Sequence, residues 1–209
     1  MKIRSVTALA VLTLALGALA PAAADAPGPA AKPGERSLAK LLAGDGTKLD
    51  TNPFDFDITE KAVLTVLGAK PGSPVAVLTD GSQRLTAFVP TDQAFKYLVR
   101  SLKGFKPKSE AKTLKQVKRL GVDTIETVLL YHVVAGRTLV SEDVLAADGA
   151  RLRTAQGGRI QVNVGHEVVL GDRDPDARDP RAIAGKLDLN RGNRQVAHGI
   201  DRVLRPLDL

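Results

Sequence analysis

The sequence contains no cysteine and no tryptophan, and aromatic residues make up only 3% of it. Without cysteine the chain can form no disulfide, no thiol nucleophile, no Cys-ligated zinc site and no lipoprotein-type lipid anchor. The stability of the fold must therefore come from packing, which a chain of this length can supply. Five Phe and two Tyr offer few surfaces on which bases could stack, so we expect no nucleic-acid partner.

Long apolar runs are also rare, and the one that stands out lies near the N-terminus, from Val6 to Ala20. It follows Lys2 and Arg4 and precedes Pro21 and the small residues Ala22–Ala24. This order is typical of a secretory signal peptide. A retained membrane anchor is the alternative, but the run is shorter than the roughly 20 apolar residues that a spanning helix needs.

Cleavage after Ala24 would make residues 1–24 the signal peptide, and cleavage after Ala26 would also satisfy the small-residue rule. Residues 25–36 are rich in Ala, Pro and Gly and predict a flexible linker. The remaining residues, 37–209, suit one domain. We expect no transmembrane segment after cleavage, and a secreted monomer held at the cell wall only by non-covalent contacts.

Acidic residues are fewer than basic ones, with 23 Asp and Glu against 30 Lys and Arg. The net charge is +7, and loss of Lys2 and Arg4 with the signal peptide would leave +5, because 7 − 2 = 5. A basic balance favours acidic partners, such as anionic wall polymers or membrane surfaces.

Four helix starts are predicted from capping residues. Asp57 with Glu60, and Asp123 with Glu126, have the spacing of a capping box. Thr91 is expected to cap a helix that ends at Gly104. Ser141 is expected to cap a short helix that ends near Ala147.

Strands are predicted mainly in the second half. Ile160, Val162 and Val164 alternate with polar residues, a Gly-His turn follows, and Val168–Leu170 is the expected returning strand. Leu85–Val89 and Val196–Val203 are further candidates. Because the helices and strands do not alternate along the chain, we predict an α+β fold.

Three segments in this order resemble blocks of the fasciclin domain, as it occurs in secreted bacterial proteins with a single such domain. They are Leu85–Phe95, Leu130–Gly136 and Asn193–Pro206. The motif residues at their joints are Pro90, Thr91, Phe95, Tyr131, His132, His198, Gly199 and Ile200. The resemblance implies two β-sheets forming a wedge with helices alongside. It also implies a non-catalytic role in adhesion, with wall, matrix, protein or glycan as partner. A buried Tyr131 and His132 would have to form hydrogen bonds, for example to backbone carbonyls.

Three segments are longer than a minimal fasciclin domain needs, namely Lys70–Arg84, Lys103–Gly121 and Gly171–Gly192. The middle one concentrates positive charge on Lys103, Lys106, Lys108, Lys112, Lys115, Lys118 and Arg119. These cations could bind an anionic glycan, a teichoic-type polymer or a lipid surface. They could also be no more than the solvated face of a helix whose Leu114, Val117 and Leu120 point inward.

Metal sites and cofactors are not expected. The three histidines, His132, His166 and His198, are widely spaced and form no HExxH motif. The last long segment offers Asp172, Asp174, Asp176 and Asp179 as candidate calcium ligands. Interleaved arginines and prolines favour instead a rigid loop held by Asp–Arg pairs.

The sequence thus predicts a secreted, non-catalytic binding or adhesion module. No nucleophile elbow, Walker loop or dinucleotide motif is present. The alternatives are an envelope polysaccharide hydrolase with a hidden carboxylate pair, or a calcium-dependent binder that uses the aspartate-rich loop.

Overall fold

The computed structural model describes residues 32–45 and 48–207. The chain divides into two units, Met1–Lys32 and Pro33–Leu209. The predicted signal peptide and both cleavage sites lie outside the described residues. Gly34 pairs with Asn193, so the folded body includes residues before the predicted boundary at Ser37. No helix within the described ranges is both long enough and apolar enough to cross a membrane.

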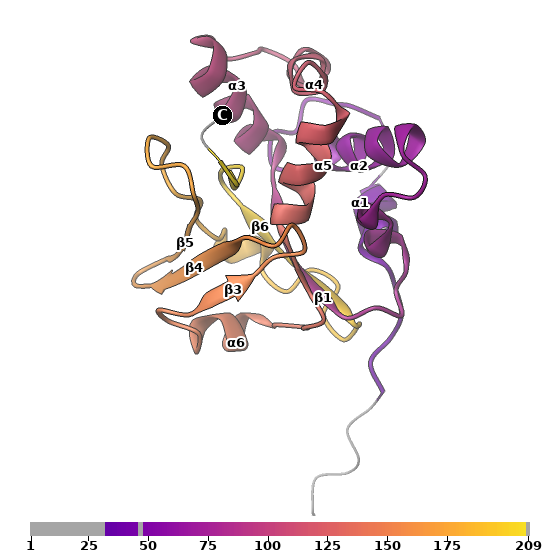
Figure 1. The fold of residues 1–209 in the computed structure, drawn as a ribbon, viewed down its shortest axis with the longest axis vertical. Coiled ribbons are helices and arrows are strands. Elements are labelled where there is room, and N and C mark those ends of the chain that lie inside the picture. Colours follow the sequence, from indigo (N-terminus) through magenta and orange to yellow (C-terminus); the bar gives the residue numbers. More distant parts are fainter. Residues whose placement is uncertain (1–31, 46–47, 208–209) are drawn as a thin grey trace, which may run out of the picture. The chain divides into compact units, whose positions relative to one another are not determined.

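The first half of the body is mainly helical (Figure 1). The α-helices are α1 (Leu38–Leu42), α2 (Asp57–Ala69), α3 (Asp92–Lys103), α4 (Glu110–Lys118), α5 (Val122–Tyr131) and α6 (Ser141–Leu145). Three short 3₁₀ turns, η1 (Ala43–Asp45), η2 (Pro74–Thr79) and η3 (Ala184–Lys186), lie between them or near the C-terminus.

In the described part of the chain, six strands form two sheets of three. The first sheet has the order β2 (Val133–Ala135), β1 (Leu85–Pro90), β6 (Gln195–Ile200), with β2 antiparallel and β6 parallel to β1. The second is an antiparallel meander of β3 (Arg151–Arg153), β4 (Arg159–Val164) and β5 (Val168–Gly171). The α+β prediction is confirmed.

The first sheet lies between the helices and the second sheet. Along β1, Leu85, Ala87 and Val89 belong to an apolar core formed with α1–α5, while Phe88 belongs to a second core formed with β3–β5. Because both faces of β1 are covered, all six of its residues are buried. β4 shows the predicted alternation instead, with Ile160 and Val162 fully buried.

Two predicted helix caps are wrong. The N-cap of α2 is Phe56, not Asp57, and the N-cap of α5 is Gly121, at φ 85°, not Asp123. The first turn of α2 is capped from another helix, because Oδ1 of Asp92 accepts the Ile58 N–H at 2.9 Å. A capping partner so distant in sequence leaves no local pattern.

Of the other two predicted caps, one is confirmed and one is wrong. Thr91 caps α3, accepting the Ala94 N–H at 3.4 Å, and α3 ends at Gly104, whose φ of 75° suits glycine. Ser141 is the first residue of α6 and not its cap. Its hydroxyl donates to Asp188 at 2.6 Å, while Asp143 accepts the Val140 N–H at 3.1 Å.

Candidate functional site

The predicted basic surface lies on α3, α4 and the loop that joins them, at the end of the body away from β3 and α6 (Figure 1). We define it by Lys103, Lys106, Lys108, Lys112, Lys115, Lys118 and Arg119, all of which are exposed. Two features of α4 produce this arrangement. Ser109 caps the helix by accepting the Lys112 N–H at 3.3 Å, and Leu114 and Val117 are buried against the helical core. The lysines are therefore left on the outer face, as predicted.

Within residues 32–45 and 48–207, none of these seven cations forms an ion pair. Arg119 donates a hydrogen bond to Gln116 at 3.0 Å, which leaves its charge uncompensated. The one acidic residue of the segment, Glu110, is only 1% exposed and contacts Lys96 at 3.4 Å. The basic surface is thus a set of exposed like charges that have no ion-pair partner among the described residues.

An aromatic side chain borders the basic surface. The ring of Tyr97 lies 4.7 Å from Nζ of Lys106 and 3.8 Å from the guanidinium carbon of Arg202, measured to the ring centroid. Both distances allow cation–π contacts. Phe105 is 50% exposed between Lys103 and Lys106 in the sequence. The surface therefore combines positive charge with apolar area, which suits a ligand that is anionic but not purely polar.

The second and third blocks are in contact at the end of α5, where Tyr131 and His132 lie. The hydroxyl of Tyr131 donates to the Arg159 carbonyl at 2.7 Å. Nδ1 of His132 lies 2.7 Å from the Val128 carbonyl, and Nε2 accepts the Leu204 N–H at 2.9 Å. The carbonyl fixes Nδ1 as the donor and the amide fixes Nε2 as the acceptor, so the ring is neutral. Burial lowers the pKa of His132 to about 4, against the opposing effect of the Val128 carbonyl.

His198 has a similar role one strand away. Nδ1 accepts the Asp188 N–H at 3.3 Å and Nε2 donates to the Leu139 carbonyl at 2.9 Å. Its ring lies 5.8 Å from that of Phe88, and burial lowers its pKa. Both histidines therefore join distant backbone segments, and their ring nitrogens are all in use.

The remaining motif residues form the joint between β1, β6 and α3. Pro90 is the last residue of β1 and is paired with Ile200 in register. Thr91 caps α3, and Phe95 packs into the helical core. Gly199 lies where a Cβ would be 2.7 Å from Cβ of Lys186, so only glycine fits without displacement.

These joints lie within the part of the chain that a family model matches. The family model for the fasciclin domain matches residues 72–206. The chain is a member of the fasciclin domain family. The match includes all three blocks and the whole basic surface, but neither α1 nor α2.

A solved structure of a FAS1 domain pair from the insect cell adhesion molecule Fasciclin I has the same fold. The alignment has a TM-score of 0.51 at 17% identity, and it covers 74% of this chain and 48% of that one. The chain thus spans about half the length of that structure. No curated protein sequence matches the chain.

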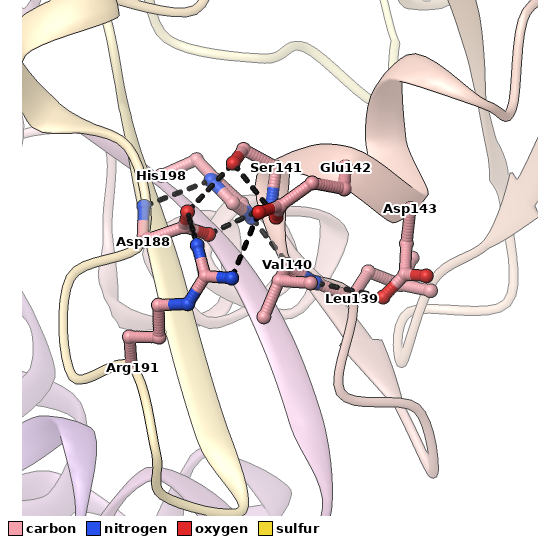
Figure 2. A network of polar contacts seen from close by, with 8 residues as sticks. All are labelled: Leu139, Val140, Ser141, Glu142, Asp143, Asp188, Arg191 and His198. Carbon is pink, nitrogen blue, oxygen red and sulfur yellow. Dashed lines mark hydrogen bonds and ion pairs between the residues drawn. The ribbon is translucent and has the colours of Figure 1, made fainter. Parts of the chain in front are cut away.

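The fasciclin domain contains one cluster of serine, aspartate and histidine, shown in Figure 2. Ser141 donates to Asp188, while His198 contacts the backbone of Asp188 and of Leu139. Arg191 donates to Oδ2 of Asp188 at 2.8 Å. A nucleophilic triad requires the imidazole to take the proton of the serine. Here both ring nitrogens bond backbone groups and not the hydroxyl, so these contacts join α6 to the loop before β6 and do not have the geometry of a nucleophilic triad.

The open grooves lined by described residues include three on the sheet side of the domain. One, of about 400 Å³, is lined by Glu167 and Asp201 among others, but Arg181 pairs with Glu167 and donates its backbone N–H to Asp201 at 2.7 Å. The second, of about 420 Å³, is lined by Arg151, Arg159 and Asp172 among others. The third, of about 460 Å³, is lined by Glu167 and Asp148 among others, and Asp148 accepts the Val164 N–H at 2.8 Å. None of these arrangements favours glycoside hydrolysis, which needs an acid and a second free carboxylate facing one cavity.

The aspartates of the loop 172–179 are engaged locally. Asp172 accepts N–H groups of Asp174 and Arg205 at 2.9 and 2.7 Å. Asp174 is buried and pairs with Arg205 at 2.9 Å, while Asp179 accepts the Asp172 N–H at 3.3 Å. The exposed Asp176 follows them. These four residues do not converge in the manner of a metal site in the described structure. Calcium binding by the loop stays a prediction.

Sequence reasoning missed the carboxylates that do converge. Asp57, Asp92 and Glu110 are the first residues of α2, α3 and α4, and each is at most 4% exposed. Burial raises the pKa of Asp92 to about 8, and the charges of Asp55, Glu110 and Asp57 add to that effect. The Ile58 N–H opposes it. The only sequence signal was an acidic residue at each helix start, which is too common to single out a site.

Proposed function

We propose that this fasciclin domain is an extracellular, non-catalytic binding module that attaches to anionic polymers of the cell envelope through the basic surface. The proposal depends on one observation: seven exposed cations lie together on α3, α4 and their loop without an ion-pair partner among the described residues. Membership of a family of adhesion-type modules supports it.

The physical basis is charge density. Cations at positions 112, 115 and 119 follow one side of α4 and its C-cap with helical spacing, so they present a row of like charges. A polyanion can neutralise such a row, and the interaction weakens with salt because the contacts are solvent-exposed. The exposed Phe105 and the half-buried Tyr97 would add apolar contact to sugar or glycerol units.

Export is the second part of the proposal. It is supported by the N-terminal pattern of Lys2 and Arg4, an apolar run and small residues before Asp25. Mass spectrometry of the protein recovered from culture medium would test it. A mature N-terminus at Asp25 or Pro27 is expected, and an intact N-terminus on cell-retained protein would contradict export.

The binding experiment compares two triple variants with equal loss of charge. K112Q/K115Q/K118Q removes three lysines of the basic surface, and K32Q/K40Q/K48Q removes three exposed lysines elsewhere. The probes are poly(glycerol phosphate), polygalacturonate and anionic phospholipid vesicles, each at low and at physiological salt. The three probes distinguish a phosphate polymer, an acidic glycan and a lipid surface as the source of the negative charge.

We expect the first variant to weaken binding of at least one probe about ten-fold and to reduce its salt dependence, and the second variant to change little. Equal losses in the two variants, or no binding of any probe by the wild-type chain at low salt, would contradict the proposed function.

A further inference from the structure

The carboxylates at the helix starts carry an inference that is independent of the basic surface. Three helices that are far apart in the sequence, α2, α3 and α4, begin close together, and each begins with an acidic residue. One carboxylate oxygen from each of Asp57, Asp92 and Glu110 lies within 4.8 Å of the other two. We call these three residues the acidic cluster.

The acidic cluster extends to the surface. Asp50, Asp55 and Asp57 form a second group with the same spacing, and Asp57 belongs to both. Asp50 is exposed, Asp55 is 8% exposed and Asp92 is completely buried. The two overlapping groups of carboxylates therefore extend from an exposed residue to a fully buried one.

Some oxygens of the acidic cluster have clear structural roles. Oδ1 of Asp92 caps α2 through the Ile58 N–H. Glu110 accepts the Asp50 N–H at 2.7 Å on one oxygen and contacts Nζ of Lys96 at 3.4 Å with the other. These contacts hold the cluster in place, as outer contacts do for metal ligands.

Oδ2 of Asp92 differs from these. It is buried, and it has no hydrogen-bond partner among the described residues. A buried, unsatisfied carboxylate oxygen costs free energy unless something else neutralises it. Because Oδ1 is committed to the start of α2, the oxygen that remains on Asp92 is the one available to a ligand within the cluster.

We propose that the acidic cluster binds one calcium ion, with carboxylate oxygens of Asp57, Asp92 and Glu110 as ligands and the more exposed Asp55 and Asp50 completing the site toward solvent. The donor set consists of oxygen alone, which suits hard cations and not zinc or copper. Calcium is favoured over magnesium because it accepts many carboxylate oxygens in irregular geometry, whereas magnesium needs a near-ideal octahedron and retains its waters.

The ion would have a structural consequence. Its ligands come from the first turns of three helices, so binding would fix α2, α3 and α4 relative to one another. α4 carries Lys112, Lys115 and Lys118 of the basic surface, and the ligand Glu110 is its first residue. The cation would thus stabilise the base of the helices whose outer face forms the proposed binding surface.

Calorimetry and thermal unfolding of the full chain test the proposal, with calcium chloride, magnesium chloride or a chelator. We expect one calcium per chain. At about 100 times the dissociation constant, we expect an increase in Tm of roughly 5–10 °C over the chelated chain, with a smaller increase for magnesium. The absence of both heat and a Tm increase in millimolar calcium would overturn the proposal.

Two variants locate the ion. D92N keeps the oxygen that caps α2 but removes the charge, and it should abolish the calcium-induced increase in Tm. D57N should do the same and serves if D92N does not fold. If both variants fold and retain the full increase, the acidic cluster is not the site.

The matched control is D176N, which removes an exposed carboxylate from the aspartate-rich loop. It should leave the calcium response unchanged. A response lost in D176N and retained in D92N would place the ion in the loop and would overturn the assignment to the acidic cluster. Neither result depends on polyanion binding, so this proposal and the proposed function can fail separately.

Discussion

Two regions of this fasciclin domain contain buried polar groups of different kinds. In and next to the first sheet, Tyr131, His132 and His198 are neutral, and each bonds to the backbone of a distant segment. At the helix starts, the groups are carboxylates that lie close to one another, and Oδ2 of Asp92 lacks a partner in the described structure.

This difference distinguishes polar groups that stabilise the fold from polar groups that could bind a ligand. Polar groups whose hydrogen bonds are all satisfied specify the packing of a core and need nothing from outside. Like charges brought together in the interior repel one another, so their arrangement makes sense only when a cation or protons neutralise them. The family motif is therefore a structural device, whereas the acidic cluster is a candidate site.

Replacement of His132 by alanine should have the largest effect on stability. It removes the only acceptor shown for the Leu204 N–H and leaves a cavity between α5 and the C-terminal segment. We expect a loss of about 3–4 kcal/mol in the free energy of unfolding, measured by urea denaturation. H166A, in an exposed turn, should change it by less than about 0.5 kcal/mol. A loss below about 1 kcal/mol for H132A would mean that the imidazole does not join these segments.

Acid should also lower the free energy of unfolding, because His132 is buried in its neutral form. His132 has a pKa of about 4 in the folded chain, below its ordinary value of about 6.5 in the unfolded chain. Between these values the unfolded chain binds a proton that the folded chain does not, so stability is full above pH 6.5 and falls as the pH drops toward 4. The full loss is roughly 3 kcal/mol from this group.

Urea denaturation at several pH values measures this effect, with H132Q as the reference because carboxylates also titrate in acid. The wild-type chain should lose stability more steeply than H132Q below pH 6.5. Parallel curves would show that His132 is not held neutral by burial.

Sequence reasoning succeeded where the determining contacts are local. The Thr91 cap, the alternation around Ile160 and the outward lysines of α4 depend on residues within a few positions of one another. It failed at Asp57, where the cap comes from Asp92 in another helix. The acidic cluster was missed for the same reason, since tertiary packing and not spacing brings its members together.

The comparison can be sharpened by neutralising one member of the acidic cluster in the absence of calcium. D92N in chelator removes repulsion while keeping the cap on α2, so we expect stability unchanged or raised by about 1 kcal/mol. Loss of charge at a buried residue would then be harmless, unlike loss of the imidazole at His132. A decrease of more than about 2 kcal/mol in urea denaturation would show that the Asp92 charge is satisfied within the chain.

The smallest effect on stability is expected at the basic surface. K112Q/K115Q/K118Q removes exposed cations that have no ion pair in the described structure, so the free energy of unfolding should stay within about 0.5 kcal/mol of wild type. K32Q/K40Q/K48Q should behave alike in urea denaturation. Because the lysines of α4 repel one another, any change in the free energy of unfolding of the first variant should be a slight gain. A loss above about 1 kcal/mol in the first variant alone would mean that these lysines stabilise the fold. Weaker polyanion binding by that variant would then reflect partial unfolding and not the loss of direct contacts.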